Sequence, residues 1–337
     1  LKKFPEHPLL GTGHGTFAIT FDKTFDAEFY DHVKHGATYF DRAHNNLVGI
    51  FSTTGILGGI TYLFIFVALL YYLFRTYRRG HINRIELSLI IALIVGYFVQ
   101  NLAVFDSLVT YVSLIALLGF VYWFSFHERE GESSQLIAET GDKKATDKEI
   151  FSWVGVGIVM LFIMYNFNIQ VLNMLTGTIN TQIAFSQRRP VQAMELQKKA
   201  MSYNTPLDRD SRSSFVSSVT SHASALSRLA PEKRNDILEY AIESAKKNVE
   251  LNPRDTMMQL ELSRIYFLAA RFRQNDQEVY KKYTSKALEA INRAIDSSPE
   301  RIPPYFIKAR ILEERGEIQK SINTLKSAAS LNENYYD

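Results

Sequence analysis

Hydrophobic side chains are concentrated in the first half of the chain, in four long segments. The segments cover residues 55–74, 87–105, 108–126 and 150–172. Each is close to the roughly 20 residues that a helix needs to cross the hydrocarbon of a bilayer. A buried helix of a soluble protein is the alternative, but four such segments in succession favour membrane spans. Only Asp106 and Ser107 separate the second from the third, which predicts a helical hairpin.

Arginines indicate how these spans are oriented. Four of them follow the first span closely, namely Arg75, Arg78, Arg79 and Arg84. Because cytoplasmic loops are enriched in Lys and Arg, loops 75–86 and 127–149 are predicted to be cytoplasmic. Residues 1–54, and everything after about Thr176, are then predicted to be extracytoplasmic.

The second half of the chain has helical periodicity and an internal repeat. Similar turns recur as LNPRD at 251–255, SSPER at 297–301 and LNENY at 331–335. The last two are 34 residues apart, which is the tetratricopeptide period. The first two are 46 residues apart, which predicts a lengthened helix pair or turn. A weaker unit is predicted at 206–253, preceded by a lone helix with Ala193 and Ala200.

Small side chains occupy equivalent places in the repeat units. They are Ala309, Ser321 and Ala328 in the last unit, and Ser263, Ala287 and Ala294 in the one before, where Tyr266 joins them. Neighbouring helices approach closely where side chains are short, and stacked helix pairs then expose a concave face. Residues 182–337 are therefore predicted to form a repeat domain that binds a protein partner or acceptor. An ordinary helical bundle is the alternative.

These patterns together predict an all-α protein of three parts. They are an extracytoplasmic loop at 1–54, a transmembrane domain at 55–175 and a tetratricopeptide-type helical solenoid at 182–337. The net charge of +3, with acidic and basic residues interspersed, does not indicate nucleic acid. The absence of cysteine excludes disulfides and thiolate metal sites. Because Leu1 and not Met begins the chain, an upstream part is expected to be missing.

Reactive side chains are densest just before the first span, where Asp41, Arg42, His44, Asn45 and Asn46 follow one another closely. A neutral imidazole near pH 7 can take a proton from a hydroxyl, and a guanidinium suits a phosphate. Asn45 and Asp41 would orient the imidazole or the guanidinium. Alternatively, His44 and Asn45 cap the following helix.

A glycine-rich turn, GTGHGTF, includes Gly11, Gly13 and His14. It resembles a phosphate-cradling loop, which makes these three residues candidate substrate contacts. It lacks the Lys-Ser/Thr ending of a nucleotide P-loop. The alternative is a turn that packs the loop onto the membrane domain.

Two further polar groups have open interpretations. A zinc site from His32, His35 and His44 is conceivable, but the spacing matches no hydrolase motif and no metal is predicted. Gln100, Asn101 and Asp106 lie at or near membrane depth. Such residues line a cavity or join helices by hydrogen bonds.

Three stretches carry a resemblance to a known family, namely HPLLGTGHGTF, FDRAHNNLVGIFSTTGILGGITYL and YFVQNLAVFDSLVTY. They resemble the C-terminal part of the O-antigen ligase and polymerase superfamily, over roughly residues 5–126. These are bacterial integral membrane glycosyltransferases with a GT-C-like fold, and members with a C-terminal tetratricopeptide domain are familiar.

The resemblance implies glycan transfer from an undecaprenyl-diphosphate carrier to an acceptor hydroxyl, at the outer face of the bacterial cytoplasmic membrane. It implies that His44 is the general base and that Arg42 contacts phosphate, without a metal or other cofactor. The family's other arginines lie in upstream segments, so this stretch is expected to be catalytically incomplete. Ligases, polymerases and protein O-glycosylating enzymes share these motifs, which leaves the acceptor open.

Two other functions are compatible with the sequence. One is a non-catalytic, membrane-anchored tetratricopeptide scaffold for cell-envelope polysaccharide assembly. The other is a transporter or channel, which is disfavoured by few intramembrane charges and no inverted repeat.

Overall fold

The computed structural model describes residues 7–32, 39–126, 146–333 and 335. Every regular element in these ranges is a helix, which confirms the all-α prediction for the described residues. The chain forms two compact units, which are described separately below. One consists of Leu1–Phe21 and Tyr39–Ala145, and the other of Asp22–Thr38 and Thr146–Asp337. The predicted boundaries at 54 and 175 do not coincide with this division.

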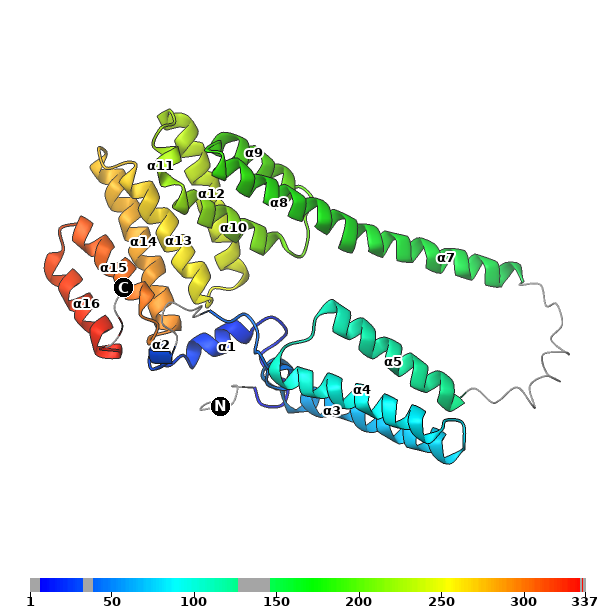
Figure 1. Ribbon diagram of the computed structural model, residues 1–337. Helices are drawn as coiled ribbons and strands as arrows, with labels where there is room; N and C mark the ends of the chain where they lie inside the picture. Colours follow the sequence, from blue (N-terminus) through cyan, green and yellow to red (C-terminus); the bar gives the residue numbers. More distant parts are fainter. Residues whose placement is uncertain (1–6, 33–38, 127–145, 334, 336–337) are drawn as a thin grey trace. The chain divides into compact units, whose positions relative to one another are not determined.

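The first unit is built around three long apolar helices, α3 (Asn46–Arg78), α4 (Arg84–Ala103) and α5 (Leu108–Phe126) (Figure 1). Helix α3 packs against both of the others. Their shared core contains Phe66, Leu69, Leu73, Ile90, Ile94 and Val121. Each helix is long and apolar enough to cross a membrane, and most of its apolar surface faces outward, with at most 22% of the most apolar window buried.

The ends of these helices follow local signals. Asn83 caps α4 in a capping box, because its side chain accepts hydrogen bonds from Ile85 N–H and Glu86 N–H while Glu86 accepts one from Asn83 N–H. Helix α3 begins at Asn46, well before the span predicted to start at residue 55. It is interrupted at Gly55, where the backbone is not helical.

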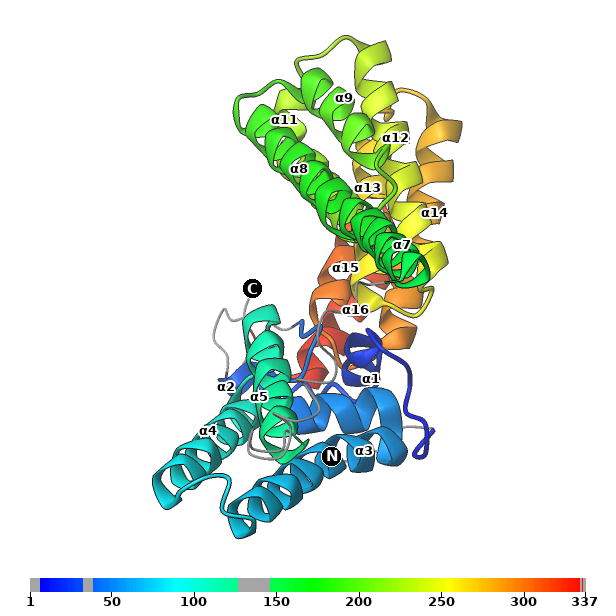
Figure 2. The same cartoon turned by 90° about the vertical axis from the view of Figure 1, so that its right-hand side faces the viewer.

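The fourth apolar segment continues directly into the repeat domain. Helix α7 (Asp147–Met164), one turn of π-helix (η1, Tyr165–Ile169) and α8 (Gln170–Ser186) form one continuous rod (Figure 2). The predicted end at residue 172 is therefore a position inside α8. Asn166 and Asn168, which weaken the apolar pattern, lie in the π-helical turn.

Helix pairs form the rest of the second unit (Figure 1). After α8 come α9 (Pro190–Met201), α10 (Asp208–Ser221), α11 (Ala223–Leu226), α12 (Pro231–Leu251), α13 (Thr256–Arg271), α14 (Gln277–Ser297), α15 (Pro303–Glu314) and α16 (Ile318–Leu331). The most extensive packing joins α13 with α14, α8 with α9 and α15 with α16. The predicted lone helix, α9, is thus paired with α8.

The small residues of the repeat lie where the paired helices meet. The Ser263 hydroxyl on α13 donates to the Ala287 carbonyl on α14 at 2.9 Å. The Ser321 hydroxyl on α16 donates to the Ala309 carbonyl on α15 at 2.8 Å. Both bonds need the close helix approach that short side chains allow, so the sequence identified the interface correctly.

Helix length accounts for the unequal repeat steps. Helices α13 and α14 have 16 and 21 residues, whereas α15 and α16 have 12 and 14. The longer step therefore contains a lengthened helix pair, one of the two alternatives that the sequence left open.

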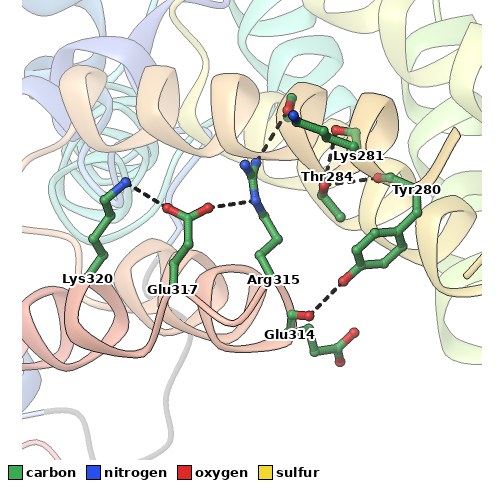
Figure 3. Close-up of polar contacts among 8 residues, drawn as sticks. Tyr280, Lys281, Thr284, Glu314, Arg315, Glu317 and Lys320 are labelled. Carbon is green, nitrogen blue, oxygen red and sulfur yellow. Dashed lines mark hydrogen bonds and ion pairs between the residues drawn. The ribbon is translucent and has the colours of Figure 1, made fainter. Parts of the chain in front are cut away.

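A short turn joins the last helix pair. Arg315 Nε and Lys320 Nζ each lie 2.7 Å from a different carboxylate oxygen of Glu317 (Figure 3). The Tyr280 hydroxyl of α14 donates to the Glu314 carbonyl at 3.0 Å, which ties this turn to the preceding pair (Figure 3).

A segment far upstream completes the second unit. Residues 22–31, here called the strap, include the start of α2 (Phe29–His32) and pack against the turns between the repeats. Phe25, Ala27 and Tyr30 of the strap are each at most 5% exposed. The repeat domain therefore includes residues that precede the first apolar helix in the chain.

Candidate functional site

Asn45 is the N-cap of α3. Its backbone is extended, and its Oδ1 accepts a hydrogen bond from Val48 N–H at 3.0 Å. Its Nδ2 donates to the Leu102 carbonyl at 2.9 Å, near the end of α4. The oxygen and the nitrogen of this side-chain amide are both hydrogen-bonded, so Asn45 fixes the position at which the loop enters α3.

His44 and Arg42 meet at one aromatic ring. The ring centroids of His44 and Phe105 are 5.5 Å apart, edge to face. The Arg42 guanidinium carbon lies 5.4 Å from the centroid of the same Phe105 ring. Phe105 comes from the link between α4 and α5, so the tertiary structure brings this basic pair to the carboxyl end of α4.

The His44 imidazole is exposed, and its other aromatic neighbour is Phe40, at a centroid distance of 6.0 Å. Within residues 39–126, neither His44 nor Arg42 makes a side-chain hydrogen bond or ion pair. Exposed Asp41 has no ion pair with Arg42 in this range. The imidazole nitrogens and the guanidinium therefore face solvent, where they can reach a hydroxyl and an anion.

Asp106 is the centre of a buried polar network. Its Oδ2 accepts hydrogen bonds from Asn46 Nδ2 at 2.6 Å and from Asn101 Nδ2 at 3.4 Å. Its Oδ1 accepts one from the Tyr97 hydroxyl at 2.8 Å. The Tyr62 hydroxyl accepts from both Asn46 and Asn101. These bonds join α3, α4 and the link before α5.

Sequence reasoning found only part of this network. It named Asn101 and Asp106 and offered helix joining as one interpretation, which the observed bonds match. Asn46, Tyr62 and Tyr97 were not connected with them, because these residues meet only when α3 and α4 pack. Gln100, named alongside Asn101, is exposed.

The glycine turn fills the break in α3. Thr12 N–H and Gly13 N–H donate to the carbonyls of Ser52 and Thr53, at 3.2 and 2.8 Å. Ile56 N–H and Leu57 N–H donate to the carbonyls of Pro8 and Leu9, at 2.8 and 3.2 Å. The backbone groups freed by the interruption at Gly55 are thus satisfied by the turn.

This geometry limits what the turn can offer a substrate. Gly11 N–H donates to the His7 carbonyl at 2.7 Å, and Gly13 N–H is bonded to Thr53. Neither amide is directed at a ligand site. His14 is exposed, so its side chain remains open to solvent.

The conceivable zinc site falls partly outside the described residues, because His35 and the side chain of His32 are among those not described. In the described part of the chain, no group of three or more His, Asp and Glu side chains is arranged to hold a metal ion.

A polar cluster in the repeat domain was not predicted. The Ser213 hydroxyl of α10 donates to Glu261 Oε1 of α13 at 2.5 Å. Burial raises the pKa of Glu261 to about 7, against the smaller lowering effect of the Ser213 hydrogen bond. Arg209 of α10 pairs with Asp255, the N-cap residue of α13, at 2.6 Å. The sequence offered no signal for this cluster beyond the polarity of α10.

Comparison with known proteins bears on the repeat domain. A family model described as the auxiliary subunit of N-terminal acetyltransferase A matches residues 224–335. This match includes α12 to α16 and leaves out the His44 loop and the four apolar helices. No curated protein was found to match the chain.

Among solved structures, the chain is similar to the crystal structure of a thermophilic TPR protein from Thermus thermophilus. The two are 21% identical, with a TM-score of 0.35, over 48% of this chain and 75% of that one. The family match and the observed helix pairs identify a tetratricopeptide-type helical domain in the C-terminal part of the chain.

Proposed function

We propose that this protein is a membrane glycosyltransferase of the O-antigen ligase and polymerase type, with His44 as general base. The observation that carries the proposal is the meeting of His44 and Arg42 on the Phe105 ring, with both polar groups open to solvent. A base and a cation held side by side are what glycan transfer from a diphosphate carrier requires.

In the proposed reaction, an imidazole nitrogen of His44 takes the proton of the acceptor hydroxyl. The acceptor oxygen then forms a bond to the anomeric carbon of the glycan. The bond from that carbon to the carrier phosphate breaks, and undecaprenyl diphosphate leaves with the electron pair. Arg42 stabilises the negative charge of the leaving diphosphate through its guanidinium N–H groups. The proposed reaction involves no metal or other cofactor.

The proposal includes four membrane crossings, by α3, α4, α5 and the rod of α7 and α8. Contacts in the second unit support this number. The strap precedes all four helices and the repeats follow them, yet the strap packs against the repeats. Residues in contact lie on one side of a membrane, so the number of crossings between them is even.

The basic loop after α3 supports the direction of crossing, with the His44 loop and the repeat domain extracytoplasmic. Single cysteines test this, because the chain has none of its own. In intact cells, a membrane-impermeant maleimide is expected to label Lys233→Cys and to spare Arg79→Cys until the membrane is opened. Equal labelling of both variants contradicts the proposed topology.

Glycan transfer itself tests the enzyme proposal. Membranes containing the full-length protein are supplied with undecaprenyl-diphosphate-linked oligosaccharide and acceptor. His44→Ala is expected to lower the transfer rate by roughly 10²–10⁴-fold, as loss of a general base does. His7→Gln is the matched control, because His7 is also exposed and only its backbone carbonyl is bonded to the turn. Wild-type rates in His44→Ala would exclude His44 as the base.

A scaffold in cell-envelope polysaccharide assembly is the second candidate. It is favoured by the match of residues 224–335 to a family described as an auxiliary subunit. In that case the repeat domain binds a partner and the protein transfers no glycan. Absence of transfer by wild type with every acceptor, together with capture of an envelope-assembly protein by the repeat domain, would replace the enzyme proposal with this one.

A further inference from the structure

The strap buries individual side chains against the repeat turns, while the residues between them face outward. Glu28, for example, is exposed. The side chains that are at most 5% exposed are those of Asp22, Phe25, Ala27 and Tyr30. All of their contacts described below lie within the second compact unit.

Ala27 is held by both of its main-chain polar groups. It lies in the link between α1 (Phe17–Lys23) and α2. Its N–H donates to Glu300 Oε2 at 3.1 Å, and its carbonyl accepts from Asn332 Nδ2 at 2.9 Å. The Asn332 amide also donates to Asp31 Oδ1 at 3.0 Å. In peptide-binding sites, main-chain hydrogen bonds give affinity and pockets for individual side chains give specificity.

Asp22 and Phe25 share one partner, Arg301. Arg301 Nη2 donates to Asp22 Oδ1 at 2.5 Å, and both side chains are at most 2% exposed. The guanidinium carbon of Arg301 lies 4.6 Å from the centroid of the Phe25 ring. The Ser298 hydroxyl donates to the Asp22 carbonyl at 2.8 Å. A buried arginine without a carboxylate is costly, so this turn selects an acidic residue at the position of Asp22.

Tyr30 extends the contact to the end of the repeats. Its hydroxyl accepts a hydrogen bond from Ile302 N–H at 3.3 Å. Its ring centroid lies 4.6 Å from that of Tyr335. The strap therefore contacts two successive turns, the one after α14 and the one after α16. Nearly three hundred residues separate the strap from these turns in sequence, so local chain geometry does not impose the contact.

We infer that Glu300, Arg301 and Asn332 form a peptide-binding site, here called the turn site, and that the strap is an exchangeable ligand that fills it in cis. The partner that the turn site fits is an extended protein segment with a carboxylate, an aromatic ring and a small residue, spaced as in the strap. This inference goes beyond the proposed function and does not depend on glycan transfer.

The attached strap competes with any added peptide, because an attached segment acts at an effective concentration of about millimolar. Wild type is therefore expected to bind little peptide at micromolar concentration. Ala27→Arg places a long side chain at a position that is 3% exposed, and this overpacking is expected to release the strap. Glu28→Arg is the matched control, since it introduces the same side chain at the next, exposed position.

The probe is a synthetic peptide of residues 22–31 with a fluorophore in place of the Glu28 side chain. Its fluorescence anisotropy is expected to report binding to full-length Ala27→Arg that is about tenfold or more tighter than binding to wild type or Glu28→Arg. Adding Asn332→Ala to Ala27→Arg removes the donor to the Ala27 carbonyl and to Asp31, and should weaken binding by about tenfold. Equal affinity of the three proteins, or affinity unchanged by Asn332→Ala, would overturn the inference.

A second measurement avoids the destabilising variant. A spin label on Glu28→Cys reports strap mobility, in a chain without other cysteines. Unlabelled peptide at about millimolar concentration is expected to displace the strap and raise the nanosecond mobility of the label. The same peptide carrying Ala27→Arg should leave the label unchanged. This result decides the inference even if Ala27→Arg unfolds the repeats. A label that stays immobile with the unmodified peptide would show that the strap is a fixed part of the domain and would overturn the inference.

Discussion

Gly11 and Gly55 contact each other through their backbones, at the point where the glycine turn enters the break in α3. A Cβ built on Gly55 would lie 2.5 Å from Gly11 N, and one built on Gly11 would lie 2.5 Å from Gly55 N. Both residues have positive φ, 70° and 69°. The two glycines are therefore required by the same close approach, although they are far apart in sequence.

Replacing Gly55 with Ala is expected to destabilise the first unit. Its φ of 69° and ψ of −167° fall in a region used almost only by glycine. The strain costs about 1–3 kcal/mol, and the clash with backbone atoms adds to it. Thermal unfolding in detergent should begin at a lower temperature than in wild type. Gly96→Ala is the control, because a Cβ there meets no atom within 4 Å. Equal melting temperatures of the two variants would disprove that the close approach of Gly11 and Gly55 stabilises the first unit.

Asp106→Ala is expected to be among the most destabilising single changes in the apolar helices. It removes the acceptor of the half-buried Tyr97 hydroxyl and one of the two acceptors of the buried amides of Asn46 and Asn101, whose other acceptor is the Tyr62 hydroxyl. Each N–H or O–H group left unsatisfied costs about 1–3 kcal/mol. Asp106→Asn keeps one carbonyl acceptor and should cost less. Gln100→Ala, at an exposed position of α4, should leave the melting temperature nearly unchanged. An equal drop in melting temperature for Asp106→Ala and Gln100→Ala would argue that the hydrogen-bond network of Asp106 does not stabilise the helices.

Asn45 and His44 are adjacent, but we expect their substitution to have different consequences. Asn45→Ala removes the cap and the bond to Leu102, which should cost about 1 kcal/mol or more of stability. Asn45→Asp keeps the acceptor for Val48 N–H and should therefore lose less stability than Asn45→Ala. His44→Ala should leave stability almost unchanged, because the imidazole is exposed. Unfolding curves of the three variants measure this, and strong destabilisation by His44→Ala would assign His44 a structural role.

The repeat domain is expected to become less stable as the pH rises through 7. Burial raises the pKa of Glu261 from 4.5 to about 7. A carboxyl whose pKa is raised by folding binds its proton more tightly in the folded state. Its stabilising contribution is therefore complete below pH 4.5 and is lost as the pH rises through 7.

Glu261→Gln should remove this pH dependence and stabilise the domain at pH 8, by up to about 3 kcal/mol. Chemical denaturation of the protein at pH 5 and pH 8, followed by the unfolding of the repeat domain, measures the difference. Glu243→Gln is the control, because Glu243 is exposed and pairs with Lys247 on the helix surface. A pH profile of Glu261→Gln that matches wild type would show that another group is responsible.

Much of the local structure could be predicted from the sequence, because it depends on residues close together in the chain. Apolar runs of fixed length predicted the four long helices. The period of small residues predicted where paired helices approach closely, and the structure places Ser263 against Ala287 and Ser321 against Ala309 at these positions. Capping by Asn45 was one of two alternatives, since a helix start needs only a side-chain acceptor within a few residues. That these four helices cross a membrane remains a proposal.

Only the tertiary structure decided which distant residues meet. The pairing of Asp22 with Arg301, the shared contact of His44 and Arg42 with Phe105, and the insertion of the glycine turn at Gly55 involve segments that no local period connects. Each depends on the packing of whole helices, which brings together backbone and side-chain groups that must be satisfied when water is excluded. The sequence alone thus determined the helices and their repeating interfaces. Long-range packing placed Phe105 against the candidate base and its arginine, and it bound the strap to the repeats.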